Sequence, residues 1–149
     1  MRLAFTCNGE PVEVDAPVDA SLLEVLRGLG HTGAKVGCEV GVCGLCTVLV
    51  AELPVSACLQ LAPCAQGRDV WTVEGIARRA PELVQAFVDA EEMQCGICTP
   101  GQVVTAFAAA AEGLAPGSPE LAEHLSGNLC RCTGYQTILE AVSAYLARG

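Results

Sequence analysis

The sequence has few basic residues. Of its 149 residues, 8 are Lys or Arg and 17 are Asp or Glu, which gives a formal net charge of -9 at pH 7. The largest basic cluster is the pair Arg78 and Arg79. Proteins that bind nucleic acids need clustered cations to neutralise phosphates, so no nucleic-acid partner is expected. We attribute most of the acidity to solubility.

Signals for export and for membrane insertion are also lacking. The start, MRLAFTCNGEPVEV, has no basic stretch followed by an apolar segment, so no secretory signal is expected. No apolar run approaches the roughly 20 residues that span a bilayer, so no membrane span is expected. We therefore expect a cytoplasmic location, where thiols stay reduced and clustered cysteines favour metal or redox chemistry over disulfides.

Ten cysteines stand out against this background. If the chain forms two units, each holds roughly 70 to 80 residues, which is near the lower limit for a self-sufficient hydrophobic core. A metal centre is a common way to stabilise so small a unit. The cysteine count therefore predicts a structural contribution from a bound metal.

The first half has the pattern of a small β-sheet with one packed helix. Asn8-Gly9 is a strong hairpin signal between strands expected at 2–6 and 11–14. Ser21 and Glu24 form a capping-box pattern that opens an amphipathic helix over 22–29. Residues 33–46 should form an irregular loop. Further strands are expected at 47–51, in the segment PVSAC and at 69–73.

The second half has the pattern of a helical bundle. EGIARRAP is interpreted as a linker, and helices are expected at 81–91, 100–112, 119–125 and about 135–147, with Thr99, Ser118 and Thr133 as caps. The fold class predicted is α+β, with domains at 1–75 and 76–149. Trp71, near this boundary, is expected to pack between the domains or onto a partner.

Three cysteines of the first half have the spacing of plant-type ferredoxins. Cys38, Cys43 and Cys46 form C-x4-C-x2-C, a pattern that is completed by a fourth cysteine further along the chain. Three thiolates can converge from one turn of chain only where the backbone is permissive, and the loop supplies Gly37, Gly41 and Gly44. Amides of these glycines are expected to point at the sulfurs.

Two cysteines compete for the fourth position. Cys58 is favoured because it follows a strand that returns to the loop, whereas Cys64 lies beyond it next to Pro63. Cys64 and Cys7 are then interpreted as small buried hydrophobic residues.

The second half contains a second set of four cysteines. Cys95 and Cys98 form C-x-x-C, and Cys130 and Cys132 form C-x-C. This combination disfavours a zinc ribbon, which uses C-x2-C twice. Both pairs also precede expected helix starts, whose positive ends suit an anionic iron-sulfur centre.

Four segments resemble the small iron-sulfur subunit of the molybdenum hydroxylases, the family of xanthine dehydrogenase, aldehyde oxidoreductase and aerobic carbon monoxide dehydrogenase. They are LLEVLRGLGHTGAKVGCEVGVCGLCTVLV, SACLQLA, EMQCGICTPGQ and GNLCRCTGYQTILEAV. Departures from the family pattern are few: Leu45 stands where Ala or Ser is usual, and Ala51-Glu52 replaces a common Asp-Gly turn.

The resemblance implies a ferredoxin-like β-grasp domain followed by a four-helix domain, each with one 2Fe-2S cluster. The implied ligands are Cys38, Cys43, Cys46 and Cys58 for the first cluster and Cys95, Cys98, Cys130 and Cys132 for the second. It also implies that Gln94 and Cys132 lie against the pterin of a molybdenum cofactor, which a separate large subunit binds. Electrons would then pass from molybdenum to the helical cluster, to the ferredoxin-like cluster and usually to FAD on a medium subunit.

The assembly implied is a heterotrimer or a dimer of heterotrimers. This chain has no candidate catalytic base, nucleophile or substrate pocket, so we expect it to transfer electrons only. Aldehydes, purines, other N-heterocycles and carbon monoxide are all candidate substrates of the complex. One alternative is the related reductive class that acts on aromatic acyl thioesters. A zinc-binding scaffold or thiol sensor is an alternative of another kind.

Overall fold

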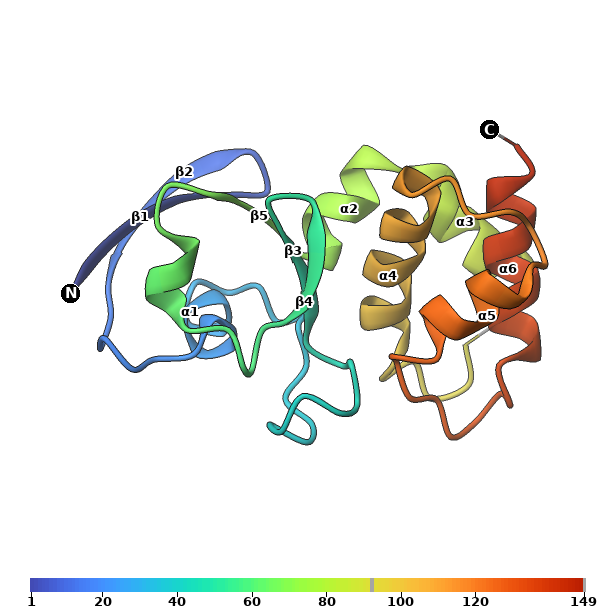
Figure 1. Cartoon of the computed structure of the whole chain (residues 1–149), viewed down its shortest axis with the longest axis horizontal. Helices are drawn as coiled ribbons and strands as arrows, with labels where there is room; N and C mark the ends of the chain where they lie inside the picture. The colour runs from blue at the N-terminus through green and yellow to red at the C-terminus, as the bar shows by residue number, and fades with distance from the viewer. Residues whose placement is uncertain (92, 149) are drawn as a thin grey trace.

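The computed structural model describes residues 1–91 and 93–148. A sheet with helix α1 forms one half of the molecule and helices α2 to α6 form the other (Figure 1). The strands are β1 (Arg2–Cys7), β2 (Glu10–Asp15), β3 (Thr47–Val50), β4 (Leu53–Ser56) and β5 (Asp69–Trp71). The helices are α1 (Leu22–Gly28), α2 (Val73–Arg79), α3 (Pro81–Asp89), α4 (Thr99–Ala111), α5 (Pro119–Leu125) and α6 (Gln136–Leu146), and a short 3-10 helix, η1, spans Ala62–Ala65.

The sheet is mixed, with strand order β2-β1-β5-β3-β4. β1 pairs antiparallel with β2 and parallel with β5, and β3 pairs antiparallel with both β4 and β5. Asn8 and Gly9 join β1 to β2 with φ values of 54° and 87°. Positive φ at both positions is the two-residue hairpin geometry that favours Asn-Gly. The strand and hairpin predictions are confirmed, with small shifts at the strand ends.

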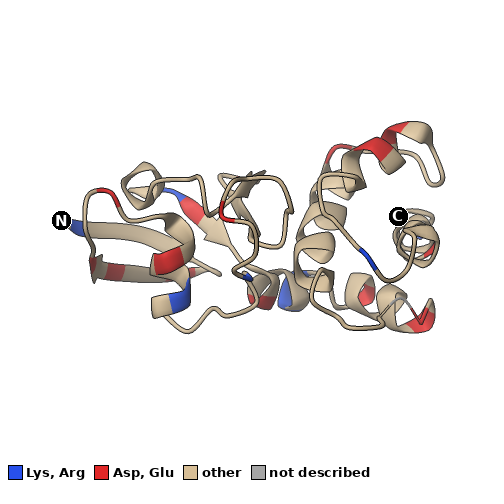
Figure 2. Ribbon diagram, turned by 90° about the horizontal axis from the view of Figure 1, so that it is seen from below, with Lys and Arg blue, Asp and Glu red and all other residues tan. Residues whose placement is uncertain are grey.

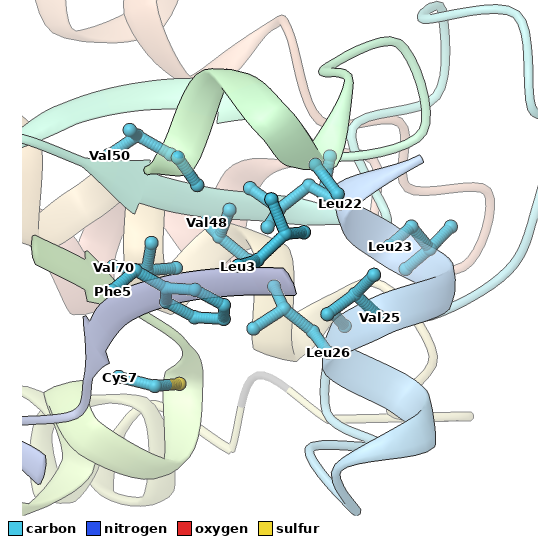
Figure 3. Packing of buried hydrophobic residues seen from close by; sticks show 14 of the residues in the cluster. Leu3, Phe5, Cys7, Leu22, Leu23, Val25, Leu26, Val48, Val50 and Val70 are labelled. Carbon is cyan, nitrogen blue, oxygen red and sulfur yellow. The ribbon is translucent and has the colours of Figure 1, made fainter. Parts of the chain in front are cut away.

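One face of the sheet packs against α1 and forms the first core (Figure 3). The helix begins as predicted: the Ser21 hydroxyl accepts from the amide of Glu24 at 3.2 Å, and the Glu24 carboxylate accepts from the amide of Ser21 at 2.8 Å. The side chains that fill this core alternate along the strands and repeat along the helix. They include Leu3, Phe5, Cys7, Leu22, Leu26, Val48, Val50 and Val70.

Strand β3 is buried on both faces, because the helical half covers the face that α1 does not. Val48 and Val50 belong to the first core, whereas Leu49 belongs to the second core, within the helices. A strand covered on both sides needs an uninterrupted apolar run, which explains the sequence TVLV. Strand β3 therefore contributes side chains to the hydrophobic cores of both halves.

Helix α2 corrects the sequence interpretation, which treated EGIARRAP as a linker. Val73–Arg79 is helical, and Ile76 is fully buried in the second core. A Cβ at Gly75 would lie 2.1 Å from Oδ1 of Asn8 and 2.8 Å from Cε3 of Trp71, so only glycine lets α2 approach the sheet this closely. Tertiary packing holds this helix despite its short length and its glycine.

The other four helices of this half lie where they were expected, but only one predicted cap is confirmed. The Ser118 hydroxyl accepts from the amide of Leu121 at 3.2 Å. Thr99 is the first residue of α4, and Cys98 precedes it as the N-cap. At α6 the N-cap is Tyr135, while the Thr133 hydroxyl accepts from the Tyr135 amide at 3.2 Å. None of the helices in the described part of the chain is long and apolar enough to cross a membrane.

Trp71 packs at the junction of the two halves, as predicted. It contacts the second core, and the Arg79 guanidinium lies 4.3 Å from the centre of its ring and 4.8 Å from that of Phe107. Arg79 also donates to both carboxylate oxygens of Glu52, at 3.1 and 3.5 Å. Glu52 lies in the β3–β4 turn with a φ of 65°. Arg79 therefore connects the β3–β4 turn to α2 through its ion pair with Glu52.

This arrangement predicts different outcomes for two single substitutions. Glu52→Gly removes a partly exposed ion pair but relieves a left-handed backbone, two effects of about 1 kcal/mol or less that oppose each other. Arg79→Ala removes the ion pair and both ring contacts, so it should cost about 1 to 2 kcal/mol. Urea unfolding of both variants beside the parent measures the difference. An equal loss in both variants would show that the ion pair, and not the aromatic stacking, fastens the turn.

Candidate iron-sulfur centres

The first four cysteines come together around the loop between α1 and β3. Cys38, Cys43 and Cys46 lie on the loop, and Cys58 follows β4, which returns beside it because β4 pairs antiparallel with β3. The amide of Ala57 donates to the carbonyl of Cys46 at 3.4 Å, which places Cys58 next to Cys46. Cys64 instead lies on η1 with an exposed side chain. Its interpretation as a buried hydrophobic residue is wrong, whereas Cys7 is 2 % exposed in the first core.

Backbone amides surround the sulfur of Cys38. Those of Val40, Val42 and Cys43 donate to it at 3.4, 3.3 and 3.3 Å. These hydrogen bonds lower the pKa of the Cys38 thiol to about 6, which favours the thiolate form at neutral pH. Burial raises the pKa of Cys46 to about 11. The donors that the structure shows belong to these residues rather than to the glycines expected from the sequence.

The glycines instead allow a tight backbone conformation in this loop. Gly41 has a φ of 74°, and a Cβ at Gly37 would lie 2.7 Å from the Leu45 side chain and 3.0 Å from the Cys43 sulfur. The loop can therefore turn tightly enough to bring its three cysteines close to one another, because these positions carry no side chain.

The second four cysteines lie at the beginnings of α4 and α6. Cys98 directly precedes α4, and Cys130 and Cys132 lie shortly before α6. The sulfurs of Cys95 and Cys132 are 3.4 Å apart. A hydrogen bond from the Ile97 amide lowers the pKa of Cys95, and contact with Cys95 raises that of Cys132. The predicted placement of this group ahead of two helices is confirmed.

The thiols of both groups associate in pairs. Cys38 interacts with Cys43, Cys46 with Cys58, Cys95 with Cys132 and Cys98 with Cys130. A 2Fe-2S cluster takes four thiolates, two on each iron, so two pairs per group fit its ligand set. Within the described residues, no three His, Cys, Asp or Glu side chains are grouped so as to hold one metal ion. No disulfide bond joins any of the ten cysteines, all of which lie in the described part of the chain.

A hollow of about 480 Å³ lies between the first cysteine loop and the second group. Their loops lie along the same side of the molecule (Figure 1). Cys43 and Leu45 of the first loop line the hollow together with all four cysteines of the second group, and with Ile97, Leu129, Arg131 and Tyr135. The amide of Leu129 donates to the carbonyl of Cys43 at 2.8 Å. One hydrogen bond thus joins a cysteine of the first group to the residue that precedes Cys130.

Gln94 and Cys132 also come together, at the outer rim of the second group. The Gln94 side-chain amide donates to the Cys132 carbonyl at 3.2 Å, and both residues are exposed. Met93, Ile97 and Leu129 add exposed apolar side chains nearby, at 53, 49 and 50 % exposure. Acidic residues are scattered over both halves of the molecule (Figure 2). Among Lys and Arg residues, the sequence after position 80 contains Arg131 and Arg148.

Sequence reasoning missed two polar residues that organise the second group. The Tyr135 hydroxyl accepts from the amide of Cys130 at 3.0 Å and donates to the carbonyl of Asn128 at 3.2 Å. Asn128 is 2 % exposed and reaches the first loop. The sequence showed an asparagine two residues before Cys130, but the burial of its side chain and its distant partners depend on the tertiary structure.

Comparison with known proteins agrees with this geometry. Residues 5–68 match the 2Fe-2S iron-sulfur cluster binding domain family, and residues 72–143 match the [2Fe-2S] binding domain family. The chain is thus built from two 2Fe-2S-binding domains.

Curated relatives match nearly the whole chain. The xanthine dehydrogenase iron-sulfur-binding subunit of Escherichia coli O157:H7 is 41 % identical over 95 % of this chain and 92 % of its own length. The nicotine 6-hydroxylase small subunit of Paenarthrobacter nicotinovorans is 48 % identical over 74 % of this chain and 68 % of its own length. In the xanthine dehydrogenase of Emericella nidulans, at 37 % identity, the match covers 96 % of this chain but 11 % of that longer protein.

Solved structures show the same architecture. A chain of quinoline 2-oxidoreductase from Pseudomonas putida 86 superposes with a TM-score of 0.90 at 42 % identity, covering 100 % of this chain and 97 % of that one. The chain belongs to the family of iron-sulfur small subunits of the xanthine dehydrogenase-type molybdenum hydroxylases.

Proposed function

We propose that this chain relays electrons within a molybdenum hydroxylase, from a molybdenum cofactor on a large subunit, through two 2Fe-2S clusters, to a flavin or another acceptor. The observation that carries the proposal is the pairing of eight cysteines in two groups whose loops are joined between Leu129 and Cys43. A bound 2Fe-2S cluster supplies one-electron storage at each group. The chain's own residues hold the two clusters and fix their separation.

The proposed ligands follow the two groups. Cys38, Cys43, Cys46 and Cys58 hold the first cluster, and Cys95, Cys98, Cys130 and Cys132 hold the second. Two observations support Cys58 over Cys64: its contact with Cys46, and the position of Cys64 on η1 rather than beside the loop. The amides on the Cys38 sulfur favour a negatively charged centre, because hydrogen bonds to the charged form stabilise it.

The proposed partner surface is the rim around Gln94 and Cys132. Exposed apolar side chains that gather beside functional groups mark protein interfaces, and Met93, Ile97 and Leu129 gather here. We propose that a large subunit covers this rim with its molybdenum-pterin cofactor against Gln94 and Cys132. The first cluster then faces away from molybdenum and toward a medium subunit that carries FAD.

The remaining proposals concern organisation. We propose a heterotrimer, or a dimer of heterotrimers, in the cytoplasm. The division into domains at 1–75 and 76–149 also remains a proposal, and α2 spans that boundary. A reductive enzyme of the aromatic acyl-thioester class would use the same chain with electrons flowing toward molybdenum. The substrate of the assembled enzyme distinguishes the two.

The fourth ligand of the first cluster is tested by serine substitutions. Cys58→Ser should disturb the paramagnetic signal of the first cluster alone, because it removes one of four thiolates. Cys64→Ser is the matched control, since it is a cysteine six positions further on, and both signals should survive in it. Electron paramagnetic resonance of the reduced proteins reads both signals. Loss of a signal in Cys64→Ser, with Cys58→Ser normal, would reverse the assignment.

The order of the carriers is tested in the assembled complex. Under substrate and without an external acceptor, Cys43→Ser should still show a substrate-reduced signal from the second cluster, while the flavin stays oxidised. Assembly and cluster content of the variant are checked first, because a lost cluster destabilises a small domain. If an intact Cys43→Ser complex gave no substrate reduction of the second cluster, the proposed order would be wrong.

A further inference from the structure

Asn128 connects the two cysteine loops through a buried side chain whose amide group bonds to three partners. Its Nδ2 donates to the carbonyl of Gly44 at 2.8 Å and to the hydroxyl of Thr47 at 3.1 Å. Its Oδ1 accepts from the hydroxyl of Thr105, on α4, at 2.6 Å. The Thr47 hydroxyl in turn donates to the Gly44 carbonyl at 2.7 Å, so the orientation of the amide is determined by its neighbours.

A backbone hydrogen bond next to the Asn128 side chain also connects the two cysteine loops. The Leu129 amide bonds to the carbonyl of Cys43, and the Asn128 side chain bonds to the carbonyl of the next residue, Gly44. On the other side, the carbonyl of Asn128 accepts from Gln102 at 2.8 Å and from the Tyr135 hydroxyl at 3.2 Å. Asn128, on the second cysteine loop, is thereby bonded to the first cysteine loop, to α4 and to the N-cap residue of α6.

The loops are in close backbone contact around this amide, with no space for side chains between them. A Cβ at Gly44 would lie 2.4 Å from the carbonyl oxygen of Gly127, and a Cβ at Gly101 would lie 2.4 Å from the carbonyl oxygen of Gly44. Backbone therefore meets backbone where the first loop crosses α4 and the second loop. Gly44 also has a φ of 68°, which disfavours other residues for a second reason.

We propose that Asn128 is a positioning residue that sets the placement of the first cysteine group relative to the second, and through it the coupling between the two centres. The inference rests on the proposed function, since it assigns a role to the distance between two clusters. Asn128 touches no cysteine sulfur in the interactions above. It acts through the carbonyl of Gly44, next to Cys43, and through its own peptide link to Leu129, next to Cys130.

A purely structural role would be shared by another buried asparagine at the junction of the halves. Asn8 is 8 % exposed, its Nδ2 donates to the Thr72 hydroxyl at 2.9 Å, and its Oδ1 accepts from the Thr72 amide at 2.9 Å. It lies in the β1–β2 turn, among residues of β5 and α2 rather than those of the cysteine loops. Asn8 is thus a matched control for the loss of a buried amide.

The test substitutes aspartate at each position in the full chain with both clusters loaded. Asn128→Asp keeps the shape of the side chain but loses both N–H donors and places a negative charge against the oxygens of Gly44 and Thr47. Asn8→Asp makes the same chemical change away from the loops. The readouts are iron content, melting temperature and the magnetic splitting between the two reduced clusters in electron paramagnetic resonance.

The expected results distinguish an effect on the relative position of the two clusters from an effect on the stability of the protein. Both variants should melt at lower temperature, but only Asn128→Asp should change the splitting and slow electron exchange between the clusters several-fold. Thr105→Val, which frees Oδ1 of Asn128, should shift the splitting in the same direction by a smaller amount. If Asn128→Asp fails to load both clusters, the splitting measured in Thr105→Val tests the proposal in its place.

Two results would overturn the inference: a loaded Asn128→Asp protein with the parent splitting, or a loaded Thr105→Val protein with the parent splitting where Asn128→Asp does not load. An equal change of splitting in Asn8→Asp would overturn it as well, since general loosening would then explain the effect. Failure of the proposed function is recognised separately, because the parent protein would then lack two interacting 2Fe-2S signals.

Discussion

The structure depends on a close backbone contact between two loops that are more than 80 residues apart in sequence. The amide of Leu129 binds the carbonyl of Cys43, and the carbonyl of Gly44 receives the side chain of Asn128. Gly44 and Gly101 permit this contact because a side chain at either position would collide with backbone. The contact places Cys43 of the first group at the hollow that all four cysteines of the second group line. An electron carrier with two centres needs this proximity, and neither half of the chain could provide it alone.

The division of the hydrophobic cores explains why the two halves hold this geometry. β3 contributes Val48 and Val50 to the core beneath α1 and Leu49 to the core among the helices. One strand is therefore a wall of both cores, and the loop that carries Cys43 and Cys46 runs directly into it. A shift of the helical half would disturb both cores as well as the loop contact. Two units too small for a large core thus stabilise one another, and bound clusters add to that stability.

Much of the fold could be predicted because its signals are local. The Asn8-Gly9 hairpin, the Ser21–Glu24 capping box and the apolar run of β3 each depend on neighbours in sequence, and the structure contains all three. Helix α2 was missed because Gly75 argues against a helix when its contact with the sheet is unknown.

The features of the candidate site were also partly predictable from local sequence and partly not. Cysteine spacing and placement ahead of helices are sequence properties, so both groups were expected where they lie, although their roles as ligands stay a proposal. The exposure of Cys64 and the reach of Asn128 to the first loop depend on tertiary structure. Spacing alone could not reveal them.

The central claim is that eight of the ten cysteines hold two 2Fe-2S clusters. Metal and sulfide analysis of the purified protein tests it most directly. The account predicts about four iron and four acid-labile sulfide per chain, with two distinct paramagnetic signals on reduction. Zinc in place of iron, or half of that iron with a single signal, would contradict it.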